Sequence, residues 1–366
     1  MNLHLFLDSP FVDRVVAKCD DYGNDNHFVL FSNEPPYYSK TDKAVRVASY
    51  DELKSTGIDL SCVRKVFIHF FSRHAIDLVL DNKERFTYYW FFWGADGYSI
   101  PELKKSILLP KTKKLEKYTL LALKKRFHYI RQSLRKNKLK QAMAYVDYCC
   151  TFVNGDYDLI KSLGYEKLKF HFFSYLSIED LAPDTIGLAK KRESHIKVQI
   201  GNSLNNTNNH LDAIDFVKRV FPESAELIFP VSYSGKAEYL STIKAYAKET
   251  HFRTSFLEDF IPLQDYLAYM NSCDFVVFFH VRQQSANNSL SALWLGKIVI
   301  MRAESTLYKF YKKNDLSVVA SEEVESYQSL NTIVESMPNR LEKNRAILMR
   351  IFNKNEVAKQ YEALFA

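Results

Sequence analysis

The chain contains the stretch VQIGNS at Val198–Ser203, where a short apolar strand pattern meets a glycine-centred turn. Residues 213–220 then place apolar side chains at helical spacing, so the segment predicts a strand, a tight turn and an amphipathic helix. Glycine permits close approach of the backbone, and the first N–H groups of a helix carry partial positive charge. These properties suit a bound diphosphate, although such a turn taken alone is more often a plain strand-to-helix connection.

The same alternation of strands and helices recurs along the whole chain. Short runs rich in β-branched and aromatic residues alternate with helix-period segments, which is typical of parallel sheets covered by helices. We therefore expect an α/β fold. The expected strands are residues 3–7, 28–31, 45–48, 66–70, 87–92, 145–152, 168–172, 196–200, 226–229, 253–256, 275–279, 298–301 and 317–319.

The length and one polar segment indicate two domains. The 366 residues exceed the roughly 100–200 that are usual for one domain. The stretch 178–195 contains Pro183, Gly187 and a run of charges before a new strand begins, as a linker would. We place one lobe at residues 1–185 and a second at 186–337. Residues 338–366 predict a C-terminal amphipathic helix, which we expect to pack back toward the first lobe.

The composition excludes several classes of protein. A hydrophobic share of 47% and a charged share of 25% are those of a globular protein, not of a disordered or fibrous chain. The five cysteines form no CxxC pair, so we expect buried thiols in a cytoplasmic protein rather than disulfides or a metal site. No apolar stretch approaches the ~20 residues that a membrane-spanning helix requires.

A second loop rich in hydrogen-bond donors follows the predicted strand at residues 275–279. It reads HVRQQSANNS at His280–Ser289 and leads into a predicted helix. Arg282 can bind a phosphate through two N–H groups, and the neighbouring amides can bind sugar hydroxyls. A solvated, well-capped loop is an equally good interpretation of this stretch alone.

A third stretch, WFFWGADGY at Trp90–Tyr98, ends an apolar strand with a carboxylate between glycines. Ligands bind beyond the carboxyl ends of open parallel sheets, so Asp96 could act there as general base for a sugar hydroxyl. The alternative is that Asp96 caps the next helix or turn.

Together, and in this order, these stretches resemble glycosyltransferase family 56, the 4-alpha-L-fucosyltransferase family. The resemblance is clearest from about Phe67 to Leu316, and the chain departs from the family pattern after Gln284, where Ser285–Asn288 replaces a glycine-rich run. The matching positions are Trp90, Trp93, Gly94, Ala95, Asp96 and Tyr98; Gly201, Asn202, Ser203, Thr207, Asn208 and His210; Pro230 and Tyr233; Tyr266, Leu267, Cys273 and Asp274; and Arg282, Gln283 and Gln284.

The resemblance implies a glycosyltransferase B-type fold, in which two Rossmann-like lobes with parallel sheets face a central cleft. The first lobe would bind the acceptor and the second a nucleotide-sugar, which is a substrate. Neither a cofactor nor a metal ion would be required.

We expect the site residues to divide among three roles. Asp96 is the expected catalytic residue, while His69, Trp93 and Tyr98 are expected on the acceptor side. The expected donor-binding residues are Gly201, Asn202, Ser203, Asn208, His210, Tyr233, Glu258, Asp259, Tyr266, Arg282, Gln283, Gln284, Asn287 and Asn288. Among these, Glu258 or Asp259 would bind the ribose. Tyr233 or Tyr266 would stack on the base, although a single tyrosine is more often a packing residue.

The positive charge is concentrated in one segment. Between Lys104 and Lys140 there are fourteen lysines and arginines and one acidic residue, Glu116. Residues 123–134 place apolar side chains at helical spacing, so we expect a cationic amphipathic helix that contacts an anionic membrane surface. The alternative is a solvated helix whose apolar stripe faces the core. The expected membrane residues are Lys111, Lys113, Lys114, Lys124, Lys125 and Arg126.

The function that follows is transfer of a deoxy-aminosugar, similar to N-acetylfucosamine, from a TDP- or UDP-sugar to a polyprenyl-diphosphate-linked glycan. Such an enzyme would be cytoplasmic and peripheral at the inner face of the cell membrane. A nucleotide-sugar epimerase of the same fold is the second interpretation. A nucleic-acid-binding protein is the third and weakest, because the charge is confined to one segment and nothing resembles a nucleic-acid module. The sequence does not determine the oligomeric state.

Overall fold

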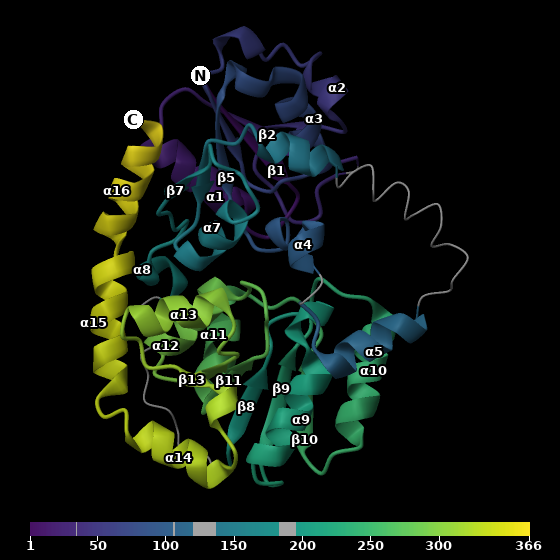
Figure 1. Ribbon diagram of the computed structural model, residues 1–366, viewed down its shortest axis with the longest axis vertical. Helices are drawn as coiled ribbons and strands as arrows, with labels where there is room; N and C mark the ends of the chain where they lie inside the picture. The colour runs from purple at the N-terminus through teal and green to yellow at the C-terminus, as the bar shows by residue number, and fades with distance from the viewer. Residues whose placement is uncertain (34, 105–106, 120–136, 183–194) are drawn as a thin grey trace. The chain divides into compact units, whose positions relative to one another are not determined.

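The computed structural model describes residues 1–33, 35–104, 107–119, 137–182 and 195–366 (Figure 1). They form two compact units. Unit 1 contains the described residues of 1–104, 137–175 and 355–366, and unit 2 contains those of 107–119, 176–182 and 195–354. The boundary that we expected after residue 185 lies outside the described residues.

Unit 1 is built on one parallel sheet of seven strands in the order β3-β2-β1-β4-β5-β6-β7. Leu3, Leu5, Phe67 and Trp90 on its inner strands are at most 1% exposed. A parallel sheet covered on both faces needs such continuous apolar runs. The strands are β1 (Asn2–Leu7), β2 (Asn26–Phe31), β3 (Ala44–Val47), β4 (Lys65–Ile68), β5 (Thr87–Phe91), β6 (Tyr148–Cys150) and β7 (Lys169–His171).

The helices of unit 1 include a C-terminal segment that is remote in sequence from the rest. They are α1 (Val12–Tyr22), α2 (Tyr50–Leu53), α3 (Arg73–Asn82), α4 (Pro101–Lys104), residues 137–143, α7 (Asn154–Lys161) and α16 (Lys354–Phe365), with 3₁₀ turns at Leu60–Cys62, Lys83–Arg85 and Gly97–Ser99. From α16, Val357, Tyr361 and Leu364 are buried in the core of this unit.

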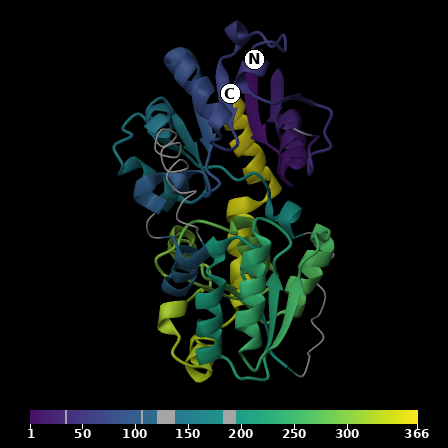
Figure 2. The same cartoon turned by 90° about the vertical axis from the view of Figure 1, so that its right-hand side faces the viewer.

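Unit 2 is built on a second parallel sheet, of six strands, in the order β10-β9-β8-β11-β12-β13. These strands are teal to yellow-green in Figure 2. They are β8 (Lys197–Ile200), β9 (Glu226–Pro230), β10 (Arg253–Leu257), β11 (Phe275–Phe278), β12 (Ile298–Met301) and β13 (Val319–Ala320). The helices of this unit are α5 (Pro110–Thr119), α8 (Ile178–Leu181), α9 (His210–Val220), α10 (Ala237–Lys248), α11 (Leu263–Ser272), α12 (Ala286–Trp294), α13 (Thr306–Lys313), α14 (Tyr327–Glu335) and α15 (Arg340–Phe352), with 3₁₀ turns at Asn206–Asn208 and Ser321–Glu323.

In each sheet the first strand in sequence, β1 or β8, has neighbouring strands on both sides. The chain adds strands first on one side of it and then on the other. The chain moves outward from β8 to β9 and β10, then returns to place β11 on the other side of β8. The loops that leave β8 and β11 therefore diverge, and the carboxyl ends of these two strands flank the crevice in which open α/β sheets bind ligands.

The α/β prediction is confirmed, and a strand is present at each of the expected places. One of them, β6, is shorter than the predicted 145–152. Residues 144–146 instead continue the turn after helix 137–143, with backbone hydrogen bonds from Ala144 to Gln141 and from Tyr145 to Ala142. The apolar side chain of Val146, for example, is buried although this residue does not belong to the sheet.

The C-terminal segment is two helices rather than the single one predicted. Asn353, between α15 and α16, has an extended backbone with ψ 163°. Its side-chain Nδ2 donates to the Met349 carbonyl oxygen at 2.6 Å. Short polar side chains make such bonds to backbone groups at helix ends.

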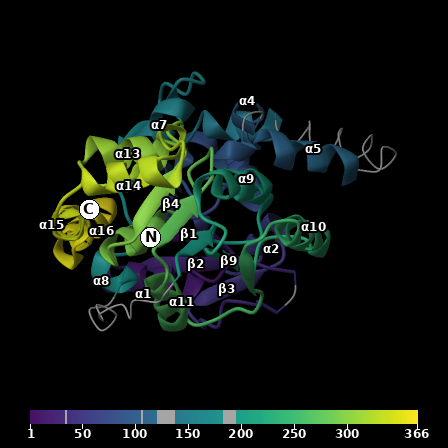
Figure 3. The ribbon, with the colours of Figure 1, turned by 90° about the horizontal axis from the view of Figure 1, so that it is seen from below.

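Helix α5, at the start of the basic segment, belongs to unit 2 and lies beside α9 (Figure 3). The Asp212 carboxylate on α9 accepts the backbone N–H groups of Lys111 and Thr112 at 3.0 Å each, and the Thr112 hydroxyl at 2.7 Å. Those donors are free at the beginning of a helix, so Asp212 caps α5 from a neighbouring element. Lys111 Nζ lies 2.5 Å from an Asp215 oxygen.

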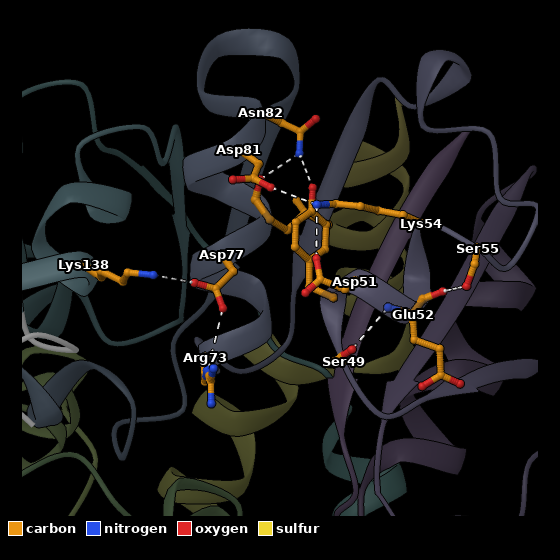
Figure 4. Close-up of polar contacts among 12 residues, drawn as sticks. Ser49, Asp51, Glu52, Lys54, Ser55, Arg73, Asp77, Asp81, Asn82 and Lys138 are labelled. Carbon is orange, nitrogen blue, oxygen red and sulfur yellow. Dashed lines mark hydrogen bonds and ion pairs between the residues drawn. The ribbon is translucent and has the colours of Figure 1, made fainter. Parts of the chain in front are cut away.

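At the other end of the basic segment, Lys138 and Lys140 pair with acidic residues of unit 1. Lys138 Nζ donates to Asp77 on α3 at 3.2 Å, within the surface network in Figure 4, and Lys140 pairs with Glu102. These pairs are exposed and each contributes little stability, but they compensate part of the segment's charge. Residues 120–136, with Lys124, Lys125 and Arg126, lie outside the described residues. Within the described part, no helix is long and apolar enough to cross a membrane.

We predict that Leu364→Ala destabilises the protein, because Leu364 of α16 is fully buried in unit 1. Removing such a side chain from a core lowers the free energy of unfolding by about 2–5 kcal/mol. Glu362→Ala, at an exposed position of the same helix, is the matched control and should change it by less than about 0.5 kcal/mol. Urea unfolding followed by circular dichroism measures both. Equal midpoints for the two variants would show that α16 does not stabilise unit 1.

Candidate functional site

The turn after β8 has the geometry that its sequence requires. Gly201 has φ +70°, and its N–H donates to the Val277 carbonyl of β11 at 2.9 Å. A Cβ at this position would lie 2.7 Å from Asn208 Oδ1 and 3.1 Å from His210 Nε2. Both the positive φ and the close approach therefore require glycine.

The Asn208 side chain holds the whole loop in place and is fully buried. Its Oδ1 accepts the Asn202 backbone N–H at 3.1 Å and lies 2.7 Å from His280 Nε2. Its Nδ2 donates to the Ser203 carbonyl and hydroxyl oxygens and to the Asn205 carbonyl, at 2.9, 3.2 and 3.0 Å. These contacts fix the orientation of the amide and join the loop after β8 to the first residues after β11.

Further side chains join the loops after β8, β9 and β11. Asn202 Nδ2 donates to the Tyr233 hydroxyl at 3.0 Å, and Gln284 Nε2 donates to Asn202 Oδ1 at 3.2 Å. Arg282 Nη2 donates to the Thr207 hydroxyl at 3.1 Å, and that hydroxyl lies 2.5 Å from Gln284 Oε1. We call this group, with Gly201, Ser203 and Asn208, the switch-point network.

A buried glutamine in β8 contacts the network through the backbone of Gly201. Gln199 is 1% exposed, and its Nε2 donates to the Tyr266 hydroxyl at 2.9 Å and to the Gly201 carbonyl at 3.1 Å. Gln199 and the role of His280 were not predicted from the sequence. A polar residue in an otherwise apolar buried strand, and a histidine directly after one, were the signals that could have identified them.

Two buried histidines beside the network are neutral. Burial lowers the pKa of His210 to about 3, and burial together with nearby Arg282 holds the pKa of His280 well below its usual range. His280 Nε2 carries the proton because it faces an amide oxygen, so Nδ1 is an acceptor. Among the described residues, His280 Nδ1 and Gln283 Oε1 are buried without a hydrogen-bond partner. Such atoms cost about 1–3 kcal/mol each unless a water or a ligand satisfies them.

Besides His210 and Gln283, four expected donor-binding residues make none of the side-chain hydrogen bonds described above. Glu258 and Asp259 follow β10 and are exposed, and Glu258 Oε1 accepts from Lys244 at 2.6 Å. Asn287 and Asn288 are half-buried in the first turn of α12. Their roles toward a nucleotide or a sugar stay predictions.

In unit 1, Asp96 is 3% exposed and accepts three hydrogen bonds. Its Oδ2 accepts from Trp90 Nε1 at 2.7 Å and from the Phe71 N–H at 3.2 Å, and its Oδ1 accepts from the Gly97 N–H at 3.0 Å. Burial raises the pKa of this carboxyl. Asp96 thus caps the 3₁₀ turn Gly97–Ser99, which was the alternative to a catalytic role. The general-base assignment stays a prediction.

The residues expected on the acceptor side are mainly packed in unit 1. The His69 ring stacks on Phe6 and Phe91, with ring centroids 4.0 and 4.5 Å apart. Tyr98 is buried and its hydroxyl donates to Asp156 Oδ1 at 3.2 Å. Trp93 is half-buried.

His4, Cys19 and His69 are the one group of possible metal ligands found among the described residues, with ligand atoms within 4.8 Å of one another. His4 Nδ1 lies 3.0 Å from His69 Nε2, and the outer ring nitrogens lie 3.3 Å from Asn26 Oδ1 and 2.7 Å from the Tyr175 hydroxyl. Burial lowers the pKa of His4 to about 3 and that of His69 well below its usual range. If both histidine rings are neutral, each of these three hydrogen bonds has one donor and one acceptor. The cluster is therefore explained as part of the core.

Glycosyltransferases are among the known proteins that resemble this chain. The family model of the 4-alpha-L-fucosyltransferase glycosyl transferase group 56 matches residues 154–361, more than half of the chain. A sucrose-phosphate synthase from Thermosynechococcus elongatus is similar over 100% of this chain and 98% of its own, with a TM-score of 0.70 and 11% sequence identity. HepE of Anabaena, solved in complex with UDP and glucose, is similar over 99% of this chain and 98% of its own, with a TM-score of 0.66 and 12% identity.

A glycosyltransferase from Rickettsia africae is also similar, over 100% of this chain and 97% of its own, with a TM-score of 0.65 and 10% identity. At these identities the likeness shows the fold alone. The two parallel-sheet units therefore have the glycosyltransferase B-type fold, as expected.

We predict that Gly201→Ala destabilises the protein much more than Gly57→Ala. Both glycines have positive φ, +70° and +78°, but only at Gly201 would an added methyl group lie within 4 Å of other atoms. Gly57→Ala should cost the left-handed backbone penalty of roughly 1–2 kcal/mol. Gly201→Ala should cost about 2 kcal/mol more, because moving Asn208 leaves buried polar groups unpaired. Equal thermal unfolding midpoints would show that the Asn208 contacts do not constrain the turn.

Proposed function

This chain belongs to the 4-alpha-L-fucosyltransferase glycosyl transferase group 56 family, and we propose that it transfers a deoxy-aminosugar from a TDP- or UDP-sugar to a polyprenyl-diphosphate-linked glycan. Membership of the family makes it a glycosyltransferase. The nature of the sugar, the nucleotide and the acceptor is the proposed part. The reaction would serve bacterial surface polysaccharide synthesis.

The observation that carries the proposal is the switch-point network. It gathers most of the expected donor residues, or their direct partners, at the carboxyl ends of β8, β9 and β11 in unit 2. A nucleotide-sugar needs cationic and N–H donors for its diphosphate and paired donors and acceptors for its sugar hydroxyls. Arg282 and the amides of Asn202 and Gln284 supply the donors. The unpartnered His280 Nδ1 and Gln283 Oε1 supply acceptors.

The leaving diphosphate is the group that most needs stabilisation during transfer. Developing negative charge is best stabilised by fixed donors that face it in a site shielded from water. We assign this role to Arg282, which is 6% exposed, and to the amino-terminal end of α12. In this proposal they provide the positive charge, and a metal ion is not required.

On the acceptor side, the proposal keeps Asp96 as the general base. A base must come within hydrogen-bond reach of the hydroxyl that it deprotonates. Oδ2 already accepts from Trp90 and Phe71, whereas among the described residues Oδ1 accepts only from the Gly97 N–H. In this proposal Oδ1 therefore receives the proton of the acceptor hydroxyl.

A lipid-linked acceptor would place the enzyme at the cytoplasmic face of the membrane. The basic segment supports this location, since near an anionic surface each lysine or arginine contributes on the order of 1 kcal/mol. Lys111 pairs with Asp215, so the binding charge would come mainly from the residues that follow it. Peripheral attachment through these side chains is our proposal.

We predict that a TDP- or UDP-sugar raises the unfolding temperature of the protein in a screen of nucleotide-sugars. A ligand at a hundred times its Kd adds about 2.7 kcal/mol of stability. Arg282→Gln should weaken binding at least about tenfold, since hydrogen bonds to charged groups contribute about 1.5–3 kcal/mol. Arg253→Gln, at an exposed position of β10, is the control and should bind normally.

Stabilisation that is the same in the Arg282→Gln and Arg253→Gln variants would contradict the assignment of the diphosphate to Arg282. Product analysis separates the two enzyme classes. A transferase modifies an added lipid-linked acceptor, whereas an epimerase converts the nucleotide-sugar when no acceptor is present.

We predict that replacing Lys113, Lys114, Lys124 and Lys125 together with glutamine weakens binding to anionic liposomes. The loss of four charges corresponds to about 4 kcal/mol at most, or roughly a thousandfold. The control replaces four exposed lysines of unit 2, Lys218, Lys248, Lys312 and Lys313, and so has the same net charge. Co-sedimentation with phosphatidylserine liposomes measures both. Membrane binding that falls equally in the two variants would show that net charge, not this segment, attracts the protein.

A further inference from the structure

Unit 2 has a cavity that no residue of the switch-point network lines. It is a cavity of about 450 Å³ at the ends of β8 and β9, bordered by α5 and α10. Its size lies within the roughly 300–1,000 Å³ that is typical of small-molecule sites. The residues that define its chemistry are Leu115, Leu204, Asn205, Asn206, Tyr239 and Thr242.

These side chains have the character of a carbohydrate site. Sugar rings present apolar C–H faces between hydroxyl groups that both donate and accept. Asn205, Asn206 and Thr242 provide amide and hydroxyl partners, while Leu115, Leu204 and the Tyr239 ring provide the apolar wall. Polar groups placed at a few points of an apolar hollow are what fix the orientation of a ligand. At the rim, Lys236 and Glu238 are exposed and add charges of both signs.

The wall of this cavity is held by the network itself. The Asn205 side-chain oxygen accepts the Thr207 N–H at 3.0 Å, and the Leu204 N–H donates to the Tyr233 carbonyl at 2.9 Å. The Tyr239 hydroxyl lies 3.2 Å from His210 Nδ1, so its ring has a fixed orientation. A ligand in the cavity would therefore lie next to the network without sharing its residues.

The opposite wall comes from α5, which supplies Thr112 and Leu115. Asp212 caps that helix, and Figures 1 and 3 show α5 beside α9 with α10 next to it. The chain continues from α5 into the rest of the basic segment. A ligand of this cavity is thus bound partly by the segment that we assign to the membrane surface, where a lipid-linked glycan would be found.

We propose that this cavity is a saccharide subsite that holds a sugar ring of the acceptor glycan. The inference rests on the proposed function, since it takes the acceptor to be a glycan. A nucleotide-sugar is the less suitable occupant, because Arg282 and the unpartnered atoms of His280 and Gln283 line no part of the cavity. In this proposal unit 2 also binds part of the acceptor, which was expected to bind only to the first lobe.

The test compares two substitutions on adjacent residues of α10. Thr242 lines the cavity and Ser241 is exposed, and each hydroxyl donates to the carbonyl four residues earlier, at 2.9 and 3.1 Å. Thr242→Phe fills the cavity, whereas Ser241→Phe adds the same ring outside it. The full chain is mixed with free N-acetylglucosamine and a panel of free disaccharides, and saturation-transfer NMR measures binding with and without UDP.

We expect at least one saccharide to bind to the wild-type chain and to Ser241→Phe, and to bind at least tenfold more weakly to Thr242→Phe. UDP should not displace it, and Thr242→Phe should raise the KM for acceptor at least tenfold while leaving the KM for donor unchanged. No saccharide binding, displacement by UDP, or weaker nucleotide-sugar binding in Thr242→Phe would each overturn the inference. Failure of the proposed function is distinct from these results, because it appears as no response to any nucleotide-sugar.

Discussion

The close contact between Gly201 and Asn208 is the constraint on which the second unit depends. Because the glycine has no side chain, the Asn208 amide can lie against the backbone and use both of its ends at once. One amide therefore joins the turn after β8 to His280, the second residue after β11. The fold brings the ends of β8 and β11 together. The hydrogen bonds of the Asn208 amide then fix the positions of the donors and acceptors there.

Neutral polar groups, rather than charges, make up most of this arrangement. Burial keeps His210 and His280 unprotonated, so Arg282 is the principal cation among the side chains of the network. In the proposed function, the negative charge of a diphosphate would complement this cation. Burial acts in the same way in unit 1, where the His4 and His69 rings bond to each other as neutral groups.

The sequence was sufficient to predict where the strands lie, because most of them are short runs rich in β-branched and aromatic residues between turn-forming residues. It also predicted that Gly201, Asn202, Asn208 and the amides after Arg282 belong together. It could not predict which atoms meet, since Asn208 and His280 are 72 residues apart. For Asp96 both interpretations agreed with the local pattern, and the bond from the Gly97 N–H to Asp96 Oδ1 in the structure shows the cap. The break at Asn353, where the side chain bonds to the Met349 carbonyl, is likewise a feature that periodicity does not encode.

Neither unit is a single continuous stretch of chain. The backbone passes from one to the other between residues 104 and 107, between 119 and 137, at 175–176 and at 354–355. During synthesis on the ribosome, the strands of unit 1 are made before those of unit 2. The core of unit 1 is complete only after α16 has been made, because Tyr361 and Leu364 belong to that core. Domains usually fold in the order of their synthesis, and here that order should be reversed, with unit 2 completed before unit 1.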